Sequence, residues 1–153
     1  MSLAKCLPIT LLAIHIGIFG LTEFSGLNTV SHGNPFVWVA TPFSLPLIAQ
    51  NDTGTVVTIG LLATLWWYFI GLIGSSSARG KLSRTGSALG TALILFFCVI
   101  DAVGMFSELR SIRRDTQLTV ADDLIYILAT TLLAGGVISA GYSATNALGF
   151  RRN

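Results

Sequence analysis

Two ionisable side chains stand inside long apolar stretches of this 153-residue chain. His15 lies in the run LPITLLAIHIGIFGL, and Asp101 lies in the run ALGTALILFFCVIDAVGMF. A charged side chain at the centre of a membrane span costs about 2.5–3.5 kcal/mol on insertion scales. Asp101 therefore needs a partner, protonation of its carboxyl group, or contact with a water-filled cavity.

His15 and Asp101 are expected at similar depths in the membrane, because each precedes the outer end of its apolar run by about five or six residues. If their helices are neighbours, the two side chains form an intramembrane polar pair. The simplest interpretation of that pair is a hydrogen bond between helices. A proton or ion relay and a single histidine ligand for a tetrapyrrole are the alternatives.

Patterns typical of enzymes and metal sites are missing from the sequence. It contains no HExxH, GxSxG, P-loop or dinucleotide-binding glycine motif. Cys6 and Cys98 form neither a CxxC pair nor a cluster with histidines, which argues against a zinc site and a disulfide framework. We predict no enzymatic activity, no metal site and no cofactor, although contact with a pigment or quinone stays open.

The apolar composition indicates a membrane protein. Hydrophobic residues make up 52% of the chain and charged residues only 10%, against roughly 25% charged residues in soluble domains. The basic residues stand next to the apolar runs and the net charge is only +2, so no nucleic-acid partner is expected. We expect an integral, multi-pass protein of the lipid bilayer. The bacterial cytoplasmic membrane fits best, since no cleavable targeting segment is recognised.

Four apolar runs predict an all-α fold in one membrane domain, residues 1–153. Each run is close to the roughly 20 residues that cross a bilayer. Six basic residues flank one side of the spans and three flank the other, so both termini are expected to be cytoplasmic. The predicted four-helix bundle has helices at about residues 5–21, 55–74, 87–106 and 122–150, and a long proline-containing outer loop at 22–54.

The outer loop is apolar but contains Pro35, Pro42 and Pro46, which argue against a continuous helix. Its aromatic residues suit the membrane interface or a position tucked back onto the bundle. A lid over the bundle is the simpler interpretation, and a surface for a partner is the alternative. Interfacial aromatic side chains are predicted at Trp38, Trp66 and Trp67.

The last helix carries a stripe of small residues. Gly136, Ala140 and Ala144 recur at every fourth position and so share one helix face. Small residues let membrane helices approach closely, so this stripe is predicted to be a helix-packing face. Threonines in the spans, such as Thr64, are expected to bond back to their own helix. Asn146 is expected to be hydrated near the cytoplasmic end.

These features predict a non-catalytic accessory or scaffolding subunit of a larger membrane protein complex. Its small-residue faces and its aromatic outer loop would pack against other integral membrane subunits. The alternative is a small transporter, channel or proton-coupled membrane component that uses Asp101 and His15. The two hypotheses differ in whether the chain acts alone or only within an assembly.

Overall fold

The described residues of the computed structural model, 3–24, 39–40, 53–115 and 120–150, form four long helices and no strand. The all-α prediction is confirmed. The first three helices extend further at both ends than the sequence predicted, and the last begins earlier and ends earlier. Their bounds are α1 (Leu3–Phe24), α4 (Thr53–Ala78), α5 (Arg84–Asp115) and α6 (Val120–Ala147).

Each helix contains a segment that is long and apolar enough to cross a membrane. The segments are 20 to 25 residues long, which corresponds to about 30–38 Å of helix, and the hydrocarbon core of a bilayer is about 30 Å thick. The chain is therefore a multi-pass membrane protein, with four spans in the part that the structure describes. The spans are Leu3–Thr22, Val56–Ala78, Arg84–Ser107 and Asp123–Ala147.

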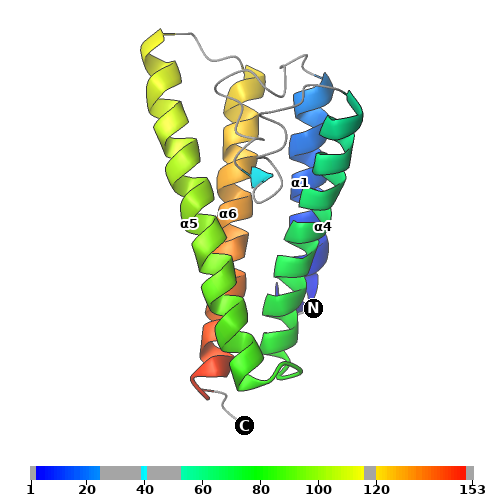
Figure 1. Cartoon of the computed structure of the whole chain (residues 1–153), viewed down its shortest axis with the longest axis vertical. Coiled ribbons are helices and arrows are strands. Elements are labelled where there is room, and N and C mark those ends of the chain that lie inside the picture. Colours follow the sequence, from blue (N-terminus) through cyan, green and yellow to red (C-terminus); the bar gives the residue numbers. More distant parts are fainter. Residues whose placement is uncertain (1–2, 25–38, 41–52, 116–119, 151–153) are drawn as a thin grey trace.

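The helices run alternately up and down, with α6 at the centre (Figure 1). α6 packs against α1, α4 and α5, and α1 packs closely along α4. α5 leans away from α4 in the upper half of Figure 1, and these two helices share little contact. We name the end that holds both chain termini and the α4–α5 connection the inner end, and the opposite end the outer end.

Glycines set the closest helix approaches in the inner half. A Cβ atom at Gly71 would lie 2.6 Å from the Cα atom of Pro8 on α1, and one at Gly74 would lie 2.7 Å from the Cα atom of Ser139 on α6. Both distances are shorter than any side chain tolerates against a backbone atom. The lack of a side chain therefore lets α4 lie against both neighbours, as small residues generally do in membrane bundles.

Three threonine hydroxyl groups in the spans donate to carbonyl groups of their own helices. Thr64, Thr130 and Thr131 each donate to the carbonyl oxygen four residues earlier, at 2.7–2.8 Å. This confirms the expectation from the sequence. A hydroxyl bonded in this way needs no pore or partner helix.

Neutral polar side chains join the inner ends of α4, α5 and α6. Asn146 Nδ2 donates to Ser87 Oγ at 2.7 Å and to the Leu82 carbonyl at 3.0 Å. The hydroxyl of Ser77 lies 3.1 Å from that of Ser87 and 3.0 Å from that of Ser143. Asn146 is therefore bonded to protein through Nδ2, because the α4–α5 connection brings a carbonyl next to it, and the side chain is only partly buried. We name these side chains the inner polar cluster: Ser77, Ser87, Ser143 and Asn146.

Candidate functional site

His15 is fully buried where α1 packs against α4. Its Nδ1 atom lies 2.8 Å from Thr64 Oγ1. The threonine hydroxyl has one proton, which it donates to the Gly60 carbonyl at 2.7 Å, so it accepts a hydrogen bond from Nδ1–H of the histidine. In the neutral ring, Nε2 is then the nitrogen that can accept a proton.

Asp101 is also fully buried, on the face of α5 that packs against α6. The buried residues of α5 recur at spacings of mostly three and four, which places them on one helix face. The carboxyl group therefore faces the protein interior and not lipid. Intramembrane acids in that position mark proton or ion pathways by default. The buried side chains on this face are Ser87, Ile94, Cys98, Asp101 and Met105.

The contacts at Gly136 place the histidine and the aspartate at similar depths. A Cβ atom at Gly136 on α6 would lie 2.6 Å from Cys98 Sγ on α5 and 3.1 Å from the Trp67 ring on α4, so these two side chains are level. Asp101 follows Cys98 by three residues toward the outer end, and Thr64 precedes Trp67 by three residues toward the same end. Three residues correspond to the same rise of about 4.5 Å on both helices.

α6 stands between the helices that carry His15 and Asp101. α1 and α5 lie on opposite sides of α6 in Figure 1 and do not form one of the main helix pairs. His15 bonds instead to Thr64 on α4. A direct contact between His15 and Asp101 stays a prediction. Both side chains are fully buried and lie at similar depths. We name His15, Thr64 and Asp101 the mid-span layer.

Two residues of the loop between α1 and α4 enter the bundle near this layer. Val39 and Ala40 are fully buried, and Trp67 Nε1 donates to the Val39 carbonyl at 2.7 Å. Figure 1 shows these two residues well below the outer end. Trp67 is in the middle of the span Val56–Ala78, where a backbone polar group requires a protein partner. The described part of the loop is thus tucked into the bundle and does not lie over it as a lid.

Trp66 and Trp67 lie at mid-span, which corrects their prediction as interfacial residues. Trp67 is fully buried in the core. Trp66 is half-buried and packs edge-to-face on Phe97, with ring centroids 5.3 Å apart, and stacks on Phe69 at 6.3 Å. Adjacent helical residues point about 100° apart, so one ring turns to the core and the next to the helix edge. Trp38 lies outside the described residues.

The small-residue stripe of α6 packs inside the chain's own bundle. Gly136 lies against side chains of α4 and α5, Ala140 is buried and Ala144 is partly buried. Ser139 and Ser143 are fully buried beside them. The stripe therefore leaves little small-residue surface for another subunit.

Four apolar spans around a buried histidine and a buried aspartate define a class: a small multi-pass membrane protein with an ionisable interior layer. Comparisons with family models, with curated proteins and with solved structures find no significant match. Among the described residues, no group of three or more histidine, cysteine, aspartate or glutamate side chains could hold a metal ion.

Proposed function

We propose that the chain is a small proton-coupled component of a bacterial cytoplasmic membrane, in which His15 and Asp101 accept and release protons inside the bundle. The observation that carries this proposal is the full burial of both side chains at one depth. Neutral groups link three helices in the inner polar cluster without any ionisable side chain. A purely structural role therefore gives little reason to retain a costly buried acid.

The roles of the two groups follow from their hydrogen bonds and positions. Nδ1–H of His15 is held by Thr64, so Nε2 is the atom that exchanges a proton. The Asp101 carboxyl group holds a proton while it is neutral and releases it when water reaches it. α1 and α5 are not one of the main helix pairs, so the proposed relay runs between the two groups through a water chain or a helix movement.

Proton flux into liposomes that contain the purified chain and a trapped pH-sensitive dye tests this proposal. The wild-type chain should carry protons down an imposed pH gradient faster than protein-free liposomes do. Asp101→Asn keeps the shape of the side chain but cannot titrate, so it should reduce the flux to the protein-free level. His15→Asn keeps an N–H donor for Thr64 and should also abolish the flux.

Thr130→Ala is the matched control, because its hydroxyl serves only its own helix. This variant should keep the wild-type flux. Two outcomes would contradict the proposal: a wild-type flux equal to that of protein-free liposomes, or an unchanged flux in a correctly folded Asp101→Asn protein.

A non-catalytic accessory or scaffolding subunit is the second candidate. The observation that favours it is the large lipid-facing surface of the helices, since only 33–44% of each span is buried inside the chain. Other integral membrane subunits would then contact large apolar side chains, because the small-residue stripe of α6 is already covered. Extraction in a mild detergent, followed by a native gel and mass spectrometry, separates the candidates. A stoichiometric complex supports the subunit, and a single chain with flux supports the proton-coupled component.

A further inference from the structure

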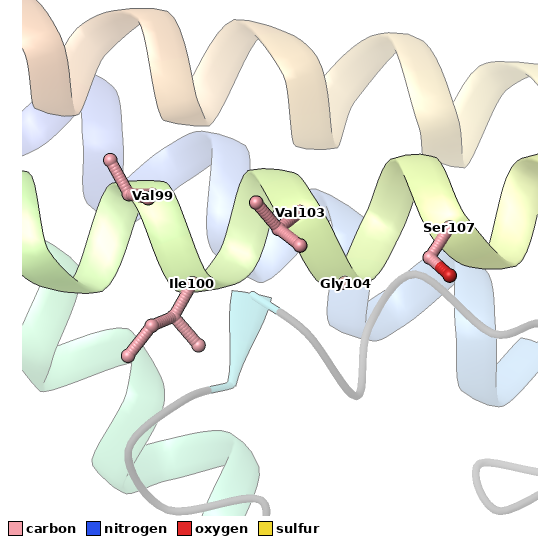
Figure 2. Close-up of a pocket in the computed structure, with 5 residues that line it drawn as sticks. All are labelled: Val99, Ile100, Val103, Gly104 and Ser107. Atoms are coloured by element: carbon pink, nitrogen blue, oxygen red, sulfur yellow. The ribbon is translucent and has the colours of Figure 1, made fainter.

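A groove of about 450 Å³ runs along the outer half of α5. Val99 and Val103 in its lining are 60% and 65% exposed, so this side of the groove is open to lipid, while Gly104 in the lining is buried. Figure 2 shows its residues in succession along one helix, with the Ser107 hydroxyl as the one polar side-chain group among them. The lining residues are Val99, Ile100, Val103, Gly104 and Ser107.

The groove ends where α5 leaves the membrane. Ser107 is the last residue of the span Arg84–Ser107. Val99, Val103 and Ser107 are spaced by four residues and Arg110 follows three residues later, so all four lie on one helix face. Val99 and Ser107 are about 12 Å apart along the helix axis, which is most of the roughly 15 Å of hydrocarbon in one leaflet.

Arg110 places a positive charge directly beyond the polar end of the groove. Its side chain is exposed, and no hydrogen bond or ion pair to it is formed within the described residues. A guanidinium group binds phosphate oxygens through two parallel N–H bonds, and a serine hydroxyl donates one more. Along α5, the apolar part of the groove is followed by the Ser107 hydroxyl and then by the Arg110 guanidinium group. This order matches a phospholipid, in which the apolar acyl chain is followed by the phosphate headgroup.

We propose that this groove binds an acidic phospholipid from the leaflet at the outer end. The acyl chain packs along Val99, Ile100 and Val103, and the phosphate accepts hydrogen bonds from Ser107 and Arg110. A headgroup with net negative charge is preferred to a zwitterionic one, because the guanidinium charge attracts it. The site is on the lipid-facing surface of α5, and lipid binding there does not depend on proton transfer in the mid-span layer.

The test compares phosphatidylglycerol with phosphatidylcholine, each added to the full-length purified chain in the same detergent. Native mass spectrometry counts the bound lipids, and thermal unfolding measures the rise in Tm that binding to the folded state produces. Phosphatidylglycerol should bind about tenfold more tightly, as expected for one charge-assisted interaction. Arg110→Gln should remove this preference, and Val103→Trp should fill the groove and weaken the binding of both lipids.

Two exposed positions elsewhere provide matched controls. Val137→Trp adds the same ring to α6 at a residue that is 53% exposed, and Lys81→Gln removes a charge at the inner end. Both should bind phosphatidylglycerol as the wild type does. Equal binding of the two lipids by the wild type would overturn the proposal, as would unchanged phosphatidylglycerol binding in the Arg110→Gln variant. If Val103→Trp does not fold, Val99→Phe tests the same groove.

Discussion

The inner and outer halves of the bundle are held together in different ways. In the inner half, α4 lies directly against its neighbours at Gly71 and Gly74, and the inner polar cluster closes the helix ends. In the outer half, α5 leans away from α4, and Val39 and Ala40 are buried in the interior. The mid-span layer lies between the two halves.

This difference separates the groups that stabilise the fold from those available for chemistry. A neutral hydrogen bond between membrane helices contributes about 0.6 kcal/mol on average and about 1.7 kcal/mol at most. A buried carboxyl group costs stability instead, and it persists where a function requires it. We therefore expect changes in the inner half to act on stability, and changes at Asp101 to act mainly on activity.

The largest effect is expected from Gly74→Ala. The added Cβ atom would lie 2.7 Å from the backbone of Ser139, so α4 and α6 must move apart. Overpacking of this kind should lower the free energy of unfolding by about 2–3 kcal/mol. Gly141→Ala is the matched control, because nothing lies within 4 Å of its added atom. Unfolding of the two variants in mixed detergent, followed by circular dichroism, measures their stabilities. Equal stabilities would show that the close approach of α4 to α6 does not stabilise the inner half.

A smaller effect is expected at mid-span from Trp67→Phe, because Trp67 bonds to the loop residue Val39. This change leaves the Val39 carbonyl without its indole donor, which should cost about 1–2 kcal/mol. Hydrogen–deuterium exchange of the peptide that contains Val39 and Ala40 should also become faster. Trp66→Phe is the control, because its indole N–H makes no hydrogen bond within the described residues, and it should change both measurements much less. Equal exchange in the two variants would argue that the loop residues are held by packing alone.

The four spans could be predicted from the sequence because a membrane allows few alternatives. Backbone groups in hydrocarbon must be bonded internally, so each apolar run of sufficient length forms a helix. The shared depth of His15 and Asp101 followed from their distances to the ends of the spans. Which helices pack against each other could not be predicted from the sequence. Lipid and protein interior are both apolar, so the sequence gives little indication of which face of a helix points into the bundle.

Two parts of the interior show why that signal was too weak. Trp66 and Trp67 are chemically identical neighbours, and only the packing of α4 decides which ring enters the core. The inner polar cluster joins serines from three helices, yet each hydroxyl could equally have bonded to its own helix. Ser77 and Ser87 stand on either side of the short basic connection between α4 and α5. An antiparallel pairing of these two helices was the only feature of the sequence that could have indicated their contact.

The smallest effect is expected from Ser143→Ala, which removes one hydrogen bond from the inner polar cluster. The loss should be about 0.6 kcal/mol, and a double-mutant cycle with Ser77→Ala should give a coupling energy of similar size. Proton flux should stay unchanged, because the cluster is neutral and lies away from the mid-span layer. Thr131→Ala, whose hydroxyl bonds only to its own helix, should show no coupling to Ser77. A coupling that exceeds the cost of Gly74→Ala would mean that hydrogen bonds, and not close backbone contact, hold the inner half together.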